Sequence, residues 1–350
     1  MTHAGPAHLT RRGLLAASGA VGLGAVLAAC GSSGSKDSSS AAGSGSGAGA
    51  ASGPWSFTDD RKKEVTAKSA PKRIVAFTGT AAALHDFGVR DQIVGVFGET
   101  KGTDGKPDPQ AGNLDLGRIE IIGNAWGEFS IEKYAALRPD LLVTHMYDAD
   151  QLWYVPEESK DKILPLAPQV AITTGRVPLP EPIRRYAELA ASLGADLKAK
   201  EVTDAKARFE AAAEKLRQAA KAANGLKVLA CSGAADIFYA SAPAMSTDLM
   251  YFKELGVDIV VPDKLDQGGY FESLSWENAG KYPADLLLLD KRSTALQPKD
   301  LAGKPGWAQL PAVKANQITP WDAVPRFSYA GAAPLLEDLA KAIESAKKLS

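Results

Sequence analysis

The chain has 350 residues, of which 45% are hydrophobic and 23% charged, and its 40 basic residues nearly balance 41 acidic ones. A formal net charge of −1 gives no reason to expect a nucleic acid partner. The part of the chain from position 55 onward is longer than a single hydrophobic core usually serves, which favours two domains over one.

The first residues are typical of an export signal. Arg11 and Arg12 precede an uncharged run rich in Ala, Gly, Leu and Val, too short and too rich in glycine to span a membrane. The paired arginines suggest the twin-arginine route, although many Sec signals carry them too. The run ends in Leu-Ala-Ala-Cys, which resembles a bacterial lipobox. We expect residues 1–29 to be a lipoprotein signal peptide and Cys30 to carry the lipid; an ordinary signal with an incidental cysteine is the alternative.

A stretch almost without apolar bulk follows the cysteine. Residues 31–53 read GSSGSKDSSSAAGSGSGAGAASG, with only Lys36 and Asp37 charged. Such a run buries too little surface to offset the entropy of ordering it. We therefore expect residues 30–54 to be a flexible tether between the membrane and a body that begins near Trp55.

In the first half of the body, short apolar strands alternate with helices. An alanine-rich helix runs from residue 78 to Gly88, and another starts after Ser130. We expect strands at residues 73–77, 93–96, 120–122, 140–143 and 170–173. This alternation is typical of parallel sheets covered by helices.

Helical sequence joins the two halves. One helix is expected over residues 181–193, and the stretch 196–223 that follows lacks Gly and Pro and is rich in Ala, Lys and Glu. A single apolar stripe repeats every seven residues along it, at Val202, Phe209 and Leu216. At about 1.5 Å per residue this helix runs roughly 42 Å, long enough for residues 194–224 to brace two lobes. A free coiled coil is disfavoured because the stripe is short and largely alanine.

The order of elements returns after residue 225. We expect strands at residues 226–231, 257–261, 285–289 and 317–319, and helices at residues 246–255, 275–282 and 331–348. The predicted fold is therefore α/β: two similar lobes, residues 55–193 and 225–350, with mainly parallel sheets, joined by one long helix and with a ligand cleft between them.

Two segments repeat one pattern. SIEKYAALRPDLLV at residues 130–143 and SWENAGKYPADLLLL at residues 275–289 align Ser130 with Ser275, Glu132 with Glu277 and Asp140 with Asp285. Each serine is a candidate helix N-cap, and each glutamate lies in the first turn near the positive end of the helix dipole. Capped helices in duplicated lobes are enough to explain this repeat.

Catalytic signatures are not found in the sequence. Cys231 stands in an apolar run and is most simply a buried core residue, because a thiol nucleophile needs an orienting histidine and the body has only His85 and His145. We find no Gly-x-Ser-x-Gly, Walker or His-Glu-x-x-His motif. No catalytic residue is therefore predicted.

Several segments of the body occur together in one order: PKRIV at residues 71–75, GVRDQIVG at 88–95, LRPD at 137–140, the long central helix, and WAQLPAVKA at 307–315. With the signal and the tether, they resemble the substrate-binding lipoproteins that feed iron-siderophore, haem and cobalamin ABC importers, over residues 70–345. The resemblance implies a monomer, anchored on the outer face of the cytoplasmic membrane, that delivers its ligand to a permease dimer. In similar proteins a glutamate of each lobe pairs with a permease arginine, and Glu132 and Glu277 fit that role by position.

Ligands of open α/β sheets lie outside the carboxyl ends of the strands. That rule, together with aromatic residues expected in loops, selects the candidate ligand contacts Trp126, His145, Tyr147, Trp153, Tyr239, Tyr270, Phe271, Arg292, Trp321, Arg326 and Tyr329. It also brings residues 78–80, 98–99, Phe238, Met245 and Lys291 to the same edge. For any one tryptophan among them, packing beneath a loop is an equal alternative.

The resemblance makes a ferric siderophore the expected ligand. Such a chelate carries its own iron, so neither a protein-bound metal nor a cofactor is expected. A ferric tris-catecholate is a trianion and needs a basic cluster, whereas a ferric tris-hydroxamate is neutral or weakly positive and suits aromatic walls with one or two arginines. Arg292 and Arg326 are the candidate donors. Hydroxamate is therefore favoured, although several relatives have an arginine where this chain has Trp126.

Other ligands and classes remain open. A bare zinc or manganese site needs several histidines, and the body has two. Haem could use His145 or a tyrosine as axial ligand, and cobalamin could fill an aromatic bowl. A surface sensor or an enzyme could share the scaffold. The loop acids Glu99, Asp148 and Asp150 are more simply solvated than catalytic.

Overall fold

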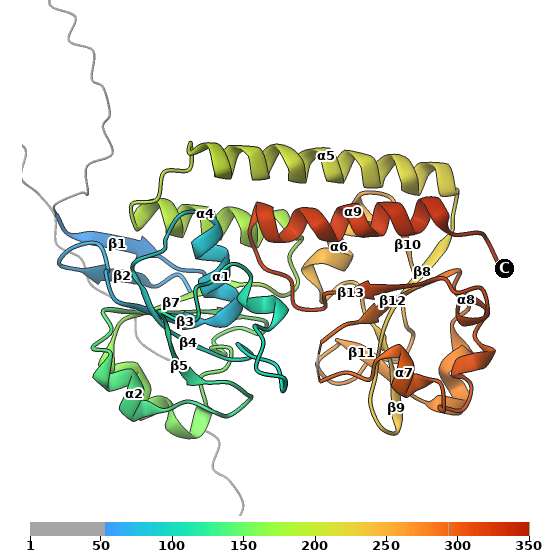
Figure 1. The fold of residues 1–350 in the computed structure, drawn as a ribbon, viewed down its shortest axis with the longest axis horizontal. Coiled ribbons are helices and arrows are strands. Elements are labelled where there is room, and N and C mark those ends of the chain that lie inside the picture. Colours follow the sequence, from blue (N-terminus) through green and yellow to red (C-terminus); the bar gives the residue numbers. More distant parts are fainter. Residues whose placement is uncertain (1–52, 293, 350) are drawn as a thin grey trace, which may run out of the picture. The chain divides into compact units, whose positions relative to one another are not determined.

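The computed structural model describes residues 53–292 and 294–349 (Figure 1). The described residues belong to one compact unit. The predictions for the signal peptide, for Cys30 and for most of the tether concern residues outside the described ranges. Within those ranges, none of the helices has the length and apolar character needed to cross a membrane.

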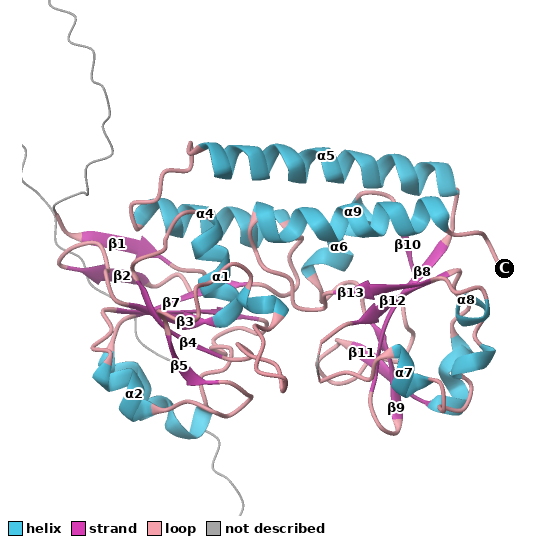
Figure 2. Ribbon diagram, in the orientation of Figure 1, coloured by secondary structure: helices cyan, strands magenta, loops and turns pink. Residues whose placement is uncertain are grey.

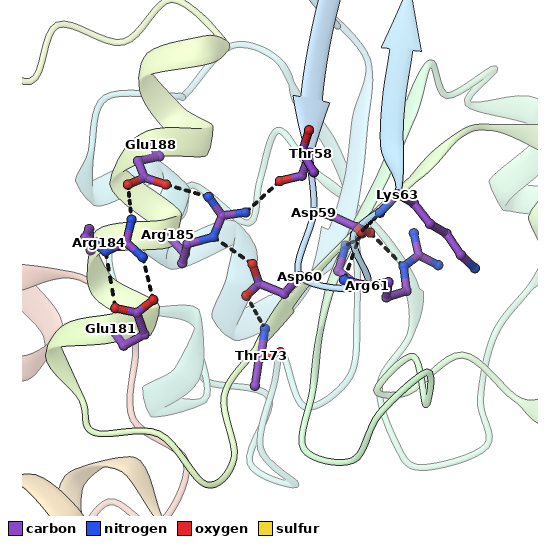
Figure 3. A network of polar contacts seen from close by, with 11 residues as sticks. Thr58, Asp59, Asp60, Arg61, Lys63, Thr173, Glu181, Arg184, Arg185 and Glu188 are labelled. Atoms are coloured by element: carbon purple, nitrogen blue, oxygen red, sulfur yellow. Dashed lines mark hydrogen bonds and ion pairs between the residues drawn. The ribbon is translucent and has the colours of Figure 1, made fainter.

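The body begins with an antiparallel hairpin that the sequence analysis did not predict. Strands β1 (Trp55–Thr58) and β2 (Glu64–Ala67) pair in it. Figure 3 shows how polar contacts fasten it: Arg185 of helix α4 donates to Asp60 at 2.7 Å and to the Thr58 carbonyl at 2.7 Å, and Asp60 accepts from the Thr173 amide at 2.8 Å. The hairpin is thereby tied to the first lobe.

The first lobe is built on a five-stranded parallel sheet of order β5-β4-β3-β6-β7. Its strands are β3 (Ile74–Phe77), β4 (Ile93–Phe97), β5 (Glu120–Gly123), β6 (Leu141–Met146) and β7 (Gln169–Thr173). Helices α1 (Thr78–Asp86), α2 (Ile131–Ala136) and α3 (Lys160–Ile163) connect them. Strands β3 and β6 are buried throughout, as expected of apolar runs covered on both faces. The five predicted strands are confirmed.

The sheet of the second lobe differs from the prediction by two strands. Its sheet has the order β11-β9-β8-β12-β13, with β10 beside β8. The parallel strands β8 (Lys227–Gly233), β10 (Asp258–Ile259), β12 (Leu286–Asp290) and β13 (Ile318–Trp321) were predicted. The antiparallel strands β9 (Ile237–Ser241) and β11 (Phe271–Ser275) were not. Tyr239 and Phe271 therefore lie on strands, and their expected placement in loops is wrong.

Three long helices lie on one side of the two sheets (Figures 1 and 2): α4 (Pro180–Ser192) over the first lobe, α9 (Tyr329–Ser345) over the second, and α5 (Lys200–Ala223) across both. Helix α5 begins four residues later than expected, because Asp196 closes a separate turn by accepting from the Lys198 amide at 2.9 Å. Its predicted stripe is buried, and Arg208 pairs with Glu337 of α9 at 2.6 Å. One continuous hydrophobic core therefore joins the lobes beneath α5.

The remaining helices are short. They are α6 (Thr247–Glu254), α7 (Pro298–Leu301) and α8 (Pro311–Lys314), with 3-10 turns at Pro109–Ala111, Glu157–Ser159, Leu164–Leu166, Trp276–Lys281 and Trp307–Gln309. The helix predicted over residues 275–282 is thus a 3-10 helix.

The repeated segments occupy matching places in the two lobes. Asp140, just before β6, accepts from the amides of Lys72 and Arg73 at 2.9 Å each. Asp285, just before β12, accepts from the Lys227 amide at 2.8 Å. In each lobe this aspartate holds the start of the neighbouring strand in register, which explains why the pattern occurs twice.

Only one of the two predicted serine caps forms. Ser130 Oγ accepts from the Lys133 amide at 3.3 Å and caps α2, as predicted. Ser275 makes no such cap; its Oγ accepts instead from the side-chain amide of Asn278 at 3.0 Å. The second cap prediction is wrong because the tighter 3-10 turn that follows Ser275 places its amides differently.

Candidate ligand-binding site

A cavity of about 520 Å³ lies between the lobes. The first lobe contributes the segment after β6 and Thr174 after β7, and the second contributes the ends of β8, β9, β11, β12 and β13 with the start of α6. The cavity thus lies at the carboxyl ends of parallel strands from both sheets, as the general rule for such sheets predicts.

Most of the predicted contact residues line this cavity: Tyr147, Trp153, Tyr239, Tyr270, Phe271, Arg292 and Trp321, together with Met245. Sequence reasoning missed Asp248 and Asp290, which also line it. Asp290 directly follows the strand predicted at residues 285–289, so the strand-end rule could have found it. Asp248 gave no signal, because an acid in the first turn of a helix is expected on structural grounds alone.

Aromatic rings form the wall supplied by the first lobe. Trp153 lies edge-on to Tyr147, with ring centroids 4.7 Å apart. Its backbone is held on both sides, because its amide donates to the His145 carbonyl at 2.9 Å and its carbonyl accepts from Thr144 Oγ1 at 2.8 Å. Trp126 does not line the cavity; it is 67% exposed and contacts Trp153 from outside at 5.1 Å.

His145 lies behind this wall. It is 1% exposed and packs edge-on to Phe77 at 4.9 Å and to Tyr147 at 5.0 Å. Burial lowers its pKa to about 3, so the imidazole is neutral at physiological pH. Neither ring nitrogen has a hydrogen-bond partner in the part of the chain that the structure describes. His145 therefore supports the aromatic wall from behind.

Charged residues mark the wall supplied by the second lobe. Arg292 donates to both carboxylate oxygens of Asp290, from Nε at 3.0 Å and from Nη2 at 2.6 Å, and the Asp290 side chain is fully buried. Asp248 accepts from the Trp321 indole N–H at 2.6 Å. Burial raises the pKa of Asp248 to about 7, which brings its titration into the physiological range.

One side of the cavity is closed by contacts between the lobes. Arg176 Nη1 lies 2.5 Å from Asp148, and the Tyr270 hydroxyl donates to the other Asp148 oxygen at 3.0 Å. The Arg176 amide donates to the Met245 carbonyl at 3.3 Å, beside an antiparallel bridge between Gly175 and Ser246. Asp148 is therefore neutralised within these contacts.

Arg326 and Tyr329 do not line the cavity, contrary to expectation. Arg326 fits so closely over Gly112 that a Cβ there would lie 1.7 Å from its Nη1, and it is directed toward Asp86 at 3.8 Å. Tyr329 begins α9 and packs against Phe87 and Phe209 at ring distances of 5.8 and 5.7 Å. Both residues belong to the seam between the lobes.

The two glutamates predicted to dock on a permease are both exposed and lie outside the cavity. Glu132 is in the first turn of α2, and Glu277 is in the 3-10 helix at Trp276–Lys281. Each is therefore accessible to a partner on its own lobe.

A larger cavity, of about 830 Å³, lies wholly within the second lobe, between β13 and the end of α9. We favour the smaller cavity as the site, because both lobes contribute to it and aromatic and charged side chains converge there. Among residues 53–292 and 294–349, no three His, Cys, Asp or Glu side chains gather as a metal site. Cys231 is buried, and burial raises the pKa of its thiol.

Comparison with known proteins identifies the family of this chain and a similar solved structure. The model of the periplasmic binding protein family matches residues 74–325. The chain is similar to DesE, a ferric-siderophore receptor protein from Streptomyces coelicolor, with 52% identity and a TM-score of 0.81, over 85% of this chain and 100% of that one. Among curated proteins, no sequence matches significantly.

Two more distant structures share the fold. The petrobactin-binding protein YclQ from Bacillus subtilis is 18% identical, with a TM-score of 0.63, over 83% of this chain and 99% of that one. SirA from Staphylococcus aureus, solved with staphyloferrin B, is 20% identical, with a TM-score of 0.59, over 84% and 99%.

Proposed function

Because this chain belongs to the periplasmic binding protein family, we propose that it captures a ferric siderophore outside the cytoplasmic membrane and delivers it to an ABC-importer permease. The observation that carries this proposal is the 52% identity to a ferric-siderophore receptor across 85% of the chain, combined with an aromatic cavity between the lobes. The protein acts as a binding protein and not as an enzyme.

The charges of the cavity support a chelate of the hydroxamate type. Among the described residues that line it, Arg292 is the one cation, and it is already paired with Asp290. Asp148 is paired with Arg176, and Asp248 adds a negative charge that no described cation balances. A trianionic tris-catecholate would meet net repulsion here, whereas a neutral or weakly positive tris-hydroxamate would not.

Aromatic surface would supply most of the affinity. Tyr147, Trp153, Tyr239, Tyr270, Phe271 and Trp321 face the chelate in this proposal. Arg292 retains Nη1, which makes no hydrogen bond to the described residues, as a donor to a hydroxamate oxygen. The iron arrives within the chelate as cargo, so the protein contributes no metal ligand.

Anchoring and delivery complete the proposal. Cys30 would carry the lipid, and the tether would let the body reach the permease. Glu132 and Glu277, exposed on separate lobes, would each pair with a permease arginine. Haem is the second candidate among the ligands of similar proteins, but His145 does not line the cavity, which leaves Met245 and the tyrosines among the described lining residues as axial ligands.

A fluorescence titration tests the ligand class. Trp153 and Trp321 line the cavity, so a bound chelate should quench their emission. The mature protein would be titrated separately with a ferric tris-hydroxamate, a ferric tris-catecholate, haem and cobalamin. We expect tight quenching by the hydroxamate alone. A response to haem or cobalamin without a response to the hydroxamate would contradict the proposed ligand, and no response to any of the four would contradict the proposed function.

A further inference from the structure

The three carboxylates that line the interlobe cavity differ in how they are neutralised. Asp148 is paired with Arg176 at 2.5 Å and also accepts from Tyr270. Asp290 is paired with Arg292 at 2.6 Å. Asp248 has no ion pair with any cation in the described part of the chain. One uncompensated acid therefore remains in the cavity.

The hydrogen bonding of Asp248 is incomplete as well. Its Oδ2 accepts from the Trp321 indole at 2.6 Å, but Oδ1 is buried without a donor among the residues that the structure describes. The residue is 1% exposed. A buried carboxylate oxygen without a donor is costly, so a donor group on a ligand would gain free energy by reaching it.

The surroundings of this oxygen favour a positive donor. The charged neighbour that acts on Asp248 is Asp322, a second acid, whose own partner is Lys291 at 3.3 Å. Across the cavity lies the Tyr147 hydroxyl, also buried and without a partner among the described residues. Because Asp322 is paired, Asp248 carries the charge that no described cation balances, and a cation placed beside its carboxylate would be attracted by it.

We propose that Asp248 binds a cationic group on the ligand, such as an ammonium at the end of an arm of the iron chelate, and so selects positively charged chelates over neutral ones. This inference rests on the proposed function and narrows its ligand class. The contact would be a charge-assisted hydrogen bond from the ammonium to Oδ1, while the aromatic wall holds the body of the chelate. Trp321 would keep Oδ2 in place.

Binding of such a cation would be linked to a proton. Asp248 is partly protonated near pH 7. A neutral chelate without an ammonium group would leave that protonation unchanged, whereas an ammonium stabilises the carboxylate and so displaces the proton. The titratable and charged groups that face Asp248 are Tyr147 from the first lobe and Asp322, paired with Lys291, from the end of β13. A positive chelate should therefore release protons on binding.

The experiment uses two probes that differ by one charge. One is a linear ferric tris-hydroxamate ending in a primary ammonium, and the other is the same chelate with that nitrogen acetylated. Dissociation constants for both would be measured by calorimetry at pH 7 in two buffers of different ionisation enthalpy, which also reports protons released. Wild type is expected to prefer the ammonium form about tenfold and to release protons only with it.

Two variants separate this contact from general effects. Asp248→Asn keeps an acceptor for Trp321 but removes the charge, so the preference should fall to about one and the proton release should disappear. Asp148→Asn is the matched control, because its carboxylate is already paired; it should change the affinity for both forms by a similar factor and leave the preference intact.

The outcomes distinguish this inference from the function on which it rests. Equal binding of both chelates by wild type, without proton release, would overturn the role of Asp248 and leave the proposed function standing. Binding of neither chelate would overturn both. Because the comparison of chelates on the wild type is decisive, the test holds even if Asp248→Asn does not fold.

Discussion

The two walls of the cavity differ in what they offer a ligand. The first-lobe wall is aromatic: Tyr147 and Trp153 face the cavity, His145 supports them, and the charge of Asp148 is cancelled by Arg176. The second-lobe wall adds Arg292, Asp290 and Asp248 to its aromatic residues. Stacking surface tolerates variation in the ligand, whereas fixed charges select its charge and orientation.

The difference follows from how each wall is built. Tyr147 and Trp153 belong to an irregular segment after β6 that contains the left-handed residues Asp150 and Tyr154, with φ of 62° and 61°. Asp290 ends β12 and Trp321 ends β13, and the two residues are partners in the register of these paired strands, so the sheet sets the distance between them. Selectivity for ligand charge should therefore depend mostly on the second wall, whereas both walls contribute aromatic surface to the affinity.

The largest effect is expected at Trp153. Trp153→Ala removes the ring that contacts Tyr147 and Trp126, and the dissociation constant of a ferric tris-hydroxamate should rise by about 30-fold, as for a buried aromatic anchor of ~2 kcal/mol. Equilibrium fluorescence quenching, followed through Trp321, measures this change. Trp153→Phe should recover most of the loss, and an alanine variant as tight as wild type would show that the first wall does not contribute to affinity.

Arg292 should come next, with effects on both affinity and stability. Arg292→Gln leaves the buried Asp290 carboxylate without its cation, so the melting temperature should fall and the dissociation constant should rise by about tenfold. Thermal unfolding and titration measure the two effects. The double change Asp290→Asn with Arg292→Gln should restore the melting temperature but not the affinity; recovery of both would mean that Arg292 serves only Asp290.

Stability should depend on pH through Asp248. Its folded pKa of about 7 lies above the unfolded value, so its favourable contribution is complete below pH 4 and is lost as pH rises through 7. The ligand-free Asp248→Asn variant should therefore melt a few degrees above wild type at pH 8, with a smaller difference at pH 5. Scanning calorimetry at both values measures this, and a difference independent of pH would place the charge of Asp248 in a less buried setting.

A smaller effect is expected from Trp126, which is exposed and touches the first wall only from outside. Trp126→Ala should raise the dissociation constant less than threefold, because it removes support for Trp153 and no cavity surface. The same titration measures it. A loss equal to that of Trp153→Ala would extend the first wall outward to Trp126.

No change in affinity is expected at the two exposed glutamates. Glu132→Ala and Glu277→Ala alter residues outside both walls, so the dissociation constant should stay within about twofold while cellular uptake of the radiolabelled iron chelate falls. Paired measurements of binding and uptake decide this. A loss of affinity would indicate that these residues influence the cavity and do not act in docking.

Much of this fold could be predicted from short apolar runs. Val75, Leu142 and Leu287 lie in strands buried on both faces, and such strands read as continuous hydrophobic segments. Strand β11, which pairs with β9, was missed because Glu272 and Ser273 interrupt its apolar pattern, and Glu272 is buried through bonds to Lys281 and Tyr282 that no sequence pattern reveals.

The site could be predicted only in part. The strand-end rule located Trp321 and Arg292, since it depends on topology alone. It also selected Arg326, but the direction of that side chain is set by Asp86 and by the absence of a side chain at Gly112, which are distant in sequence. Asp248 was missed because the sequence of α6 does not show that its Oδ1 is buried without a hydrogen-bond donor among the described residues; that depends on how the lobes pack.

The most direct test of this account is hydrogen exchange of the mature protein with and without a saturating ferric tris-hydroxamate. If the chelate lies between the walls, backbone amides in residues 145–153, 239–248 and 290–292 should become protected, while the segments lining the larger cavity, residues 315–319 and 338–349, should exchange unchanged. Protection confined to residues 315–319 and 338–349 would place the ligand within the second lobe and contradict the two-walled site.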